Sequence, residues 1–157
     1  SVPVIRYAKH IGASDERLYR ALLVSDLVTI HQKTGIGRLS AYCGAVSAGC
    51  GAGAGIAYLL GGDYRAIAHT IVNAVAILSG TICDGAKPSC AAKIASAVEA
   101  GILGYYMYVN DQQFRGGDGI VAKGVENTIR NVGLLASQGM KQTDRVILNI
   151  MTGDQCL

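Results

Sequence analysis

Residues Ala41–Leu60 read AYCGAVSAGCGAGAGIAYLL, a stretch without a charged side chain that is built mostly from glycine and alanine. A glycine inside a helix costs about 1 kcal/mol relative to alanine, so the five glycines here would break an isolated helix. Either the backbone of this segment approaches another helix closely, or the run divides into two shorter pieces near Gly49 to Gly53. No strand pattern precedes the run, which excludes a dinucleotide-binding turn. The stretch predicts an all-α, glycine-rich helical domain.

The composition narrows the class of protein further. The 157 residues include 21 glycines, no tryptophan and one phenylalanine, which suits one domain over residues 1–157 with close helix contacts. The formal charge of +3 comes from 14 basic and 11 acidic residues without a basic run, so we expect no nucleic-acid partner. Small residues gain little on transfer into lipid, so we expect no membrane span in Ala41–Leu60. An odd number of cysteines without a signal pattern favours the cytoplasm.

Helical periodicity and end signals predict the elements on either side of the glycine run. Ser14 is expected to cap a helix that ends near Lys33–Gly35. Its predicted inward face consists of Leu18, Leu22, Leu23, Leu27 and Ile30. A second helix should begin at Ser40 and carry Cys43. A third should start after Asp63 and end at Ser79–Gly80.

The C-terminal half is predicted to contain three more helices. One begins at Pro88–Ser89 and runs to Val109, and a loop follows over Asn110–Gly119. Two final helices are expected over residues 126–138 and 143–151. Their predicted inward residues are Ile129, Val132, Leu135, Val146, Ile147 and Ile150.

Three cysteines occupy positions that suit a metal. Cys83 and Cys90 bound the segment Cys83-Asp84-Gly85-Ala86-Lys87-Pro88-Ser89-Cys90, and Cys43 lies forty positions upstream. Cys90 falls in the first turn of a predicted helix, where amide N–H groups favour a metal-bound thiolate. Three thiols leave one metal position open. From spacing alone, free cysteines that fill a core explain the pattern equally well.

These cysteine motifs resemble the L-cysteine desulfidase family, relatives of the alpha chain of the bacterial iron-sulfur L-serine dehydratases. Three further motifs carry the resemblance: Val2-Pro3-Val4-Ile5, His31-Gln32-Lys33-Thr34-Gly35 and Asn131-Val132-Gly133-Leu134-Leu135-Ala136-Ser137-Gln138-Gly139-Met140. It runs through nearly the whole chain and covers the family's C-terminal part, so we expect that the family's N-terminal portion is absent. The resemblance implies a 4Fe-4S cluster bound by Cys43, Cys83 and Cys90 with one iron free. Zinc is the second choice of metal.

The resemblance also implies a lyase that converts L-cysteine to pyruvate, ammonia and sulfide. The alternatives are an L-serine dehydratase of the same superfamily and a non-catalytic structural or redox-sensing metal module. The general base is expected outside this chain, so residues 1–157 alone should be inactive. The expected partners are a small amino-acid substrate, the missing N-terminal portion and further copies of the chain in a homo-oligomer.

Several side chains are candidates for contact with the substrate. Arg38 and Lys87 could bind its carboxylate, whereas Ser40 and Asp84 are equally explained as cap or turn residues. Two histidines, His31 and His69, are candidate bases, but neither has a carboxylate at helical spacing, which favours an ordinary polar role.

The remaining cysteines are expected to stay outside the metal site. Cys50 lies one heptad beyond Cys43, where it could replace a ligand, but it is expected to pack in the core. Cys156 lies near the C-terminus, where a tail could reach an open iron or remain disordered.

Overall fold

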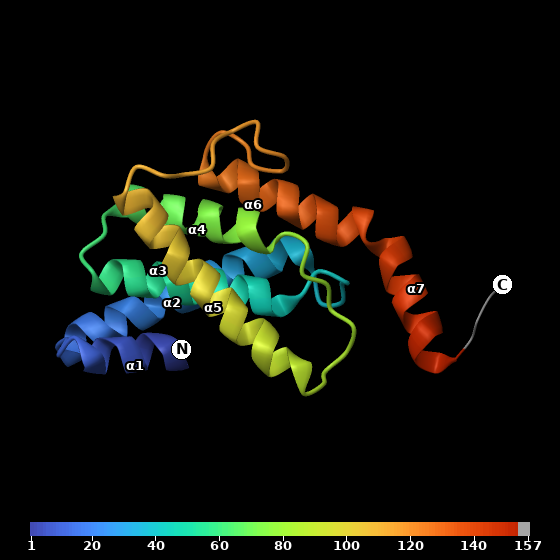
Figure 1. The fold of residues 1–157 in the computed structure, drawn as a ribbon, viewed down its shortest axis with the longest axis horizontal. Coiled ribbons are helices and arrows are strands. Elements are labelled where there is room, and N and C mark those ends of the chain that lie inside the picture. The colour runs from blue at the N-terminus through green and yellow to red at the C-terminus, as the bar shows by residue number, and fades with distance from the viewer. Residues whose placement is uncertain (154–157) are drawn as a thin grey trace.

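The computed structural model describes residues 1–153 and shows an all-α fold, as predicted, with no strand in that range (Figure 1). The elements, in chain order, are α1 (Val2–His10), α2 (Asp15–Ile36), α3 (Gly44–Leu59), α4 (Tyr64–Leu78), α5 (Ser89–Val109), α6 (Val125–Leu134), the π-helical turn η1 (Leu135–Gly139) and α7 (Lys141–Thr152). None of the helices over residues 1–153 combines the length and the apolar character that a bilayer span requires.

The glycine-rich helix α3 is the centre of the domain and packs against α2, α4 and α5. Figure 1 shows α5 crossing over α3 and α4. A Cβ on Gly53 would lie 2.6 Å from the Cα of Gly101 in α5, and a Cβ on Gly51 would lie 2.5 Å from the Ser25 carbonyl oxygen in α2. Both distances are too short for real atoms, so these glycines allow the backbones to approach. The run forms one continuous helix, and the alternative of a division near Gly49 to Gly53 is wrong.

The predicted inward face of α2 is partly wrong for the same reason. Three of its predicted members are more than half exposed: Leu23, Leu27 and Ile30. The side chains that α2 buries are those of Ala21, Ser25, Gln32 and Ile36. Small residues on this face let α2 reach the glycines of α3, which turns the large leucines outward.

The sequence reasoning missed α1. Pro3 stands in its first turn, and Val4 and Ala8 are buried at a spacing of one helical turn. Both side chains belong to a hydrophobic cluster that includes Ile56 and Leu59 of α3. This short helix therefore closes one end of the glycine-rich helix.

The positions of the last two helices were predicted correctly, but the predicted inward face of α7 was wrong. Ile129 and Val132 of α6 are buried as expected. No residue of α7 is buried, and Val146 and Ile150, which were predicted to face inward, are 47% and 73% exposed. Figure 1 shows the reason, since α7 extends away from the bundle after the π-helical turn.

Candidate metal centre

A short backbone pairing brings Cys43 and Cys83 together. Tyr42 forms an isolated antiparallel bridge with Ile82. The Cys43 N–H donates to the Thr81 carbonyl at 3.2 Å, and the Cys83 N–H donates to the Ala41 carbonyl at 2.6 Å. Cys43 thus lies opposite Thr81, and Cys83 follows two positions later on the same face. Such diagonal neighbours have Cα atoms about 7–8 Å apart.

Helix starts position two of the three thiols. Cys43 is the residue that caps α3, and its side chain makes no cap hydrogen bond. The predicted second helix therefore begins after Cys43 and not at Ser40. Cys90 lies in the first turn of α5. Both thiols consequently stand where backbone N–H groups favour an anionic ligand.

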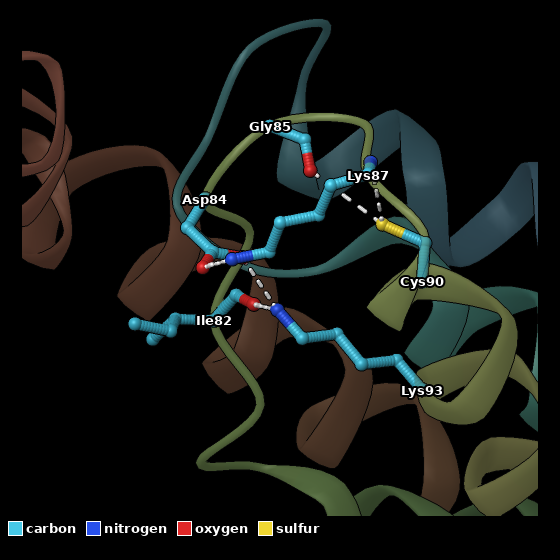
Figure 2. A network of polar contacts seen from close by, with 6 residues as sticks. All are labelled: Ile82, Asp84, Gly85, Lys87, Cys90 and Lys93. Carbon is cyan, nitrogen blue, oxygen red and sulfur yellow. Dashed lines mark hydrogen bonds and ion pairs between the residues drawn. The ribbon is translucent and has the colours of Figure 1, made fainter. Parts of the chain in front are cut away.

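The loop between Cys83 and Cys90 closes on itself (Figure 2). The Cys90 Sγ accepts a hydrogen bond from the Lys87 N–H and donates one to the Gly85 carbonyl, each at 3.5 Å. Gly85 has a φ of +91°, which favours glycine. A Cβ there would also lie 2.9 Å from the Met151 Cε of α7. The loop is therefore fixed by its own turn and by a side chain of the last helix.

Lys93 ties this loop to α5, and the sequence reasoning missed it. Its Nζ donates to the Ile82 carbonyl at 2.9 Å and to the Asp84 carboxylate at 2.6 Å (Figure 2). The hydrogen bond to Asp84 raises the pKa of Lys93, and the proximity of Cys43 and Cys90 raises it further. The Lys93 ammonium group therefore fixes the loop that carries Cys83 and Cys90. Its position one helical turn after Cys90 is the signal that could have identified it.

Asp84 is an ion-pair centre and not only a turn residue. Hydrogen bonds from Lys87, in the first place, and from Lys93 lower the pKa of its carboxyl to about 2. The Lys87 ammonium, a predicted ligand for the substrate carboxylate, is thus bound to Asp84 in this structure.

Two buried polar groups without partners lie close to the Cys50 thiol. Gln32 and Tyr42 are 2% and 1% exposed, and neither the Gln32 amide nor the Tyr42 hydroxyl has a hydrogen-bond partner among the described residues. Burial raises the pKa of Tyr42, and the nearby thiols of Cys50 and Cys43 raise it further. Each unpaired buried group costs about 1–3 kcal/mol. Such a cost calls for an explanation, and a bound group or an ordered water is one.

Cys50 itself is enclosed by the core, in keeping with the packing role expected for it. Burial raises the pKa of its thiol to about 12. Cys156 lies outside the described residues.

The three thiols match the donor type of an iron-sulfur cluster. Within residues 1–153, no three His, Cys, Asp or Glu side chains are grouped as the ligands of one metal ion. In a four-iron cluster each cysteine binds its own iron, so the sulfur atoms stand farther apart. Cys43, Cys83 and Cys90 fit that donor set.

Of the other two predicted substrate contacts, Arg38 is exposed, whereas Ser40 is hydrogen-bonded to the backbone. Arg38 is exposed in the turn after α2, where it lines a shallow groove with Lys33 and Thr34. The Ser40 hydroxyl donates to the Ala136 carbonyl at 2.8 Å and accepts the Tyr42 N–H at 3.0 Å. Ser40 therefore holds the chain in place ahead of the bridge.

The two candidate bases have different surroundings. The His31 Nε2 lies 2.8 Å from the Glu126 Oε2, a partner 95 positions away in the sequence that helical spacing could not reveal. The His69 ring stacks on Tyr108 with 5.0 Å between ring centroids. His69 lies about 14 Å along α4 from Leu78, the end that leads to Cys83. The structure does not bring His69 to the cysteines.

Comparison with known proteins identifies relatives over almost all of the chain. Residues 1–149 match the serine dehydratase alpha chain family. UPF0597 proteins of Desulfitobacterium hafniense, Lachnoclostridium phytofermentans and Treponema denticola are 69%, 54% and 52% identical over 156, 151 and 154 residues, which is 99%, 96% and 98% of this chain. The chain spans 36% of the length of each of these relatives. No solved structure matches it.

Proposed function

Because the chain belongs to the serine dehydratase alpha chain family, we propose that it is the cluster-bearing part of a lyase that acts on L-cysteine. The products would be sulfide, pyruvate and ammonia. One observation carries the proposal, namely that the bridge between Tyr42 and Ile82 sets Cys43 beside Cys83 at the turn that leads to Cys90. We assign these three thiols as the ligands of a 4Fe-4S cluster.

The proposed elimination breaks two bonds of the substrate. A base removes the Cα proton, the electron pair forms a carbon–carbon double bond, and the β-sulfur leaves as sulfide. Hydrolysis of the resulting aminoacrylate gives pyruvate and ammonia. A cluster with an open iron would supply a Lewis acid for this chemistry.

The chain's own residues would bind and orient the substrate. Arg38 has no ion-pair partner among the described residues. Its guanidinium can therefore donate hydrogen bonds to the substrate carboxylate. Lys87 is proposed as a second contact, which requires that it leave Asp84. That exchange is inexpensive, because partly exposed ion pairs are worth about 0–1 kcal/mol. Lys93 remains to hold Asp84 and the loop.

The base is proposed to lie in a part of the protein beyond these residues. The family name refers to an alpha chain, and the chain spans 36% of the length of its relatives, so the whole active site would combine this domain with another portion or a partner chain. The exposed Leu23, Leu27 and Ile30 on α2 offer an apolar surface for that contact. A reducing cytoplasm would suit the free thiols.

L-serine is the second candidate substrate, because the matching family is described by its serine dehydratase. Water would then leave in place of sulfide. The same residues serve both reactions, since the two substrates differ only at the β-atom.

Assays of the whole protein with both amino acids test the proposal. After anaerobic reconstitution, sulfide and pyruvate should form from L-cysteine faster than pyruvate forms from L-serine, and residues 1–157 alone should form neither. Faster turnover of L-serine would favour the dehydratase. An intact cluster with no turnover of either substrate would contradict a lyase and favour a structural or redox-sensing metal module.

A further inference from the structure

A cavity lies at the end of α4 that is far from the cysteines. Its volume is about 410 Å³, and it is enclosed by the first half of α4 and by the segment over residues 113–125. α4 is about 22 Å long, and the turn to Cys83 follows its far end. This cavity is therefore separate from the metal centre. Its size is that of a small-molecule site.

Four basic side chains line the cavity, and no acidic side chain does: Arg65, His69, Arg115 and Lys123. No ion pair among the described residues involves any of them. The positive charges of Arg65, Arg115 and Lys123 are consequently not neutralised by an acidic side chain at this site.

The carboxylates closest in sequence have other partners. Asp63 caps α4 by accepting the Ala66 N–H at 2.9 Å. Asp118 accepts the backbone N–H of Arg115 at 2.8 Å, and Glu126 is bound to His31 at 2.8 Å. These contacts fix the loop and the helix ends around the cavity. They leave the guanidinium groups available for a ligand.

The polar atoms around the cavity also point to a ligand. Burial lowers the pKa of His69, and the charges of Arg115 and Arg65 lower it further. The His69 Nδ1 and the Gln113 Oε1 are buried without hydrogen-bond partners. Gly124, with a φ of +88°, begins α6 without a side-chain cap. The first N–H groups of α6 are therefore open at the rim.

We propose that this cavity binds a small organic phosphate. Two guanidinium groups, an ammonium and an imidazole match the charge of a phosphate dianion, and an uncapped helix start adds N–H donors. The apolar side chains of Val72, Phe114 and Val121 form a wall for the organic part.

Calorimetric titration of the whole protein with three probes tests this site. Phenyl phosphate combines a dianion with an apolar body, inorganic phosphate lacks the body, and benzoate replaces the dianion by a monoanion. Phenyl phosphate should bind once per chain and about tenfold more tightly than either other probe, a difference of about 1.4 kcal/mol. Benzoate binding as tight as that of phenyl phosphate, or no saturable binding of phenyl phosphate, would overturn the proposal.

Paired substitutions locate the binding. The double change Arg65→Gln and Arg115→Gln should weaken phenyl phosphate binding by about tenfold or more, because it removes both guanidinium partners. Arg145→Gln on α7 removes an exposed arginine outside the cavity and should leave binding unchanged. Thermal melting without ligand separates a folding defect from lost affinity, and Lys123→Gln provides a second variant. Equal losses in Arg145→Gln and in the double variant would show non-specific attraction and overturn the assignment.

Discussion

Tyr42 and Ile82 pair as an isolated antiparallel bridge between the turn before α3 and the turn after α4. Tyr42 is buried at the start of the glycine-packed helix, whereas Ile82 is half exposed next to Cys83. The bridge therefore fixes Cys43 and Cys83 relative to the buried core, because each cysteine directly follows one of the two paired residues. Because the glycines of α3 fix that core, the packing of one helix determines where Cys43 meets Cys83.

Gly53→Ala should destabilise the domain by about 1–3 kcal/mol, because its Cβ would lie 2.6 Å from the Gly101 Cα in a contact between two backbones. Urea unfolding measures the change. Gly44→Ala is the matched control, since a Cβ there meets nothing within 4 Å. The control should leave stability unchanged or raise it by less than about 1 kcal/mol. Similar losses in both variants would contradict the close approach of α3 and α5.

Lys93→Met should loosen the loop that carries Cys83 and Cys90, because it removes the hydrogen bonds to Ile82 and Asp84. Amide hydrogen exchange over residues 83–90 should become faster, and the iron bound per chain should fall. Lys93→Arg should retain most of both properties because it keeps a cationic donor.

Lys87→Met is the control for that experiment. It removes the other ion pair of Asp84. Because Lys87 is more exposed than Lys93, its loss should have the smaller effect on iron binding. If Lys93→Met left exchange and iron content unchanged, Lys93 would have no positioning role.

Gln32→Met should stabilise the metal-free domain by about 1–3 kcal/mol, because it removes a buried amide that has no partner among the described residues. Chemical unfolding under anaerobic, metal-free conditions measures this gain. The same change should lower the iron content after reconstitution if the amide serves the metal centre. A loss of stability in the metal-free variant would show that a water or another group already satisfies the amide.

The sequence predicted the helical class and most helix boundaries because apolar residues recur at helical intervals and Ser14 and Asp63 act as caps. The outward turn of Leu27 could not be predicted in the same way. Its direction depends on which face of α2 can approach the backbone of α3, and periodicity favours the larger side chains. The direction of α7 depends on the π-helical turn before it, for which the sequence gives no recognised pattern.

Cys43, Cys83 and Cys90 stay predicted ligands, and the contacts that support their loop could not be predicted from the sequence. Cys43, Cys83 and Cys90 stood out by motif, whereas the bridge that joins them pairs residues forty positions apart. Helical spacing places Lys93 one turn after Cys90, but its contact with Asp84 spans a loop and a helix start and could not be predicted. The same holds for His31 and Glu126, which meet only because α2 packs against α6.

We infer that Cys43, Cys83 and Cys90 hold a four-iron cluster. Anaerobic reconstitution followed by iron and sulfide analysis and an absorption spectrum tests this inference. We expect about four irons and four sulfides per chain. Ser substitution at Cys43, Cys83 or Cys90 should remove most of them, and Ser substitution at Cys156 should not. Equal sensitivity of all these cysteines, or no iron and sulfide uptake by the unsubstituted protein, would contradict the claim.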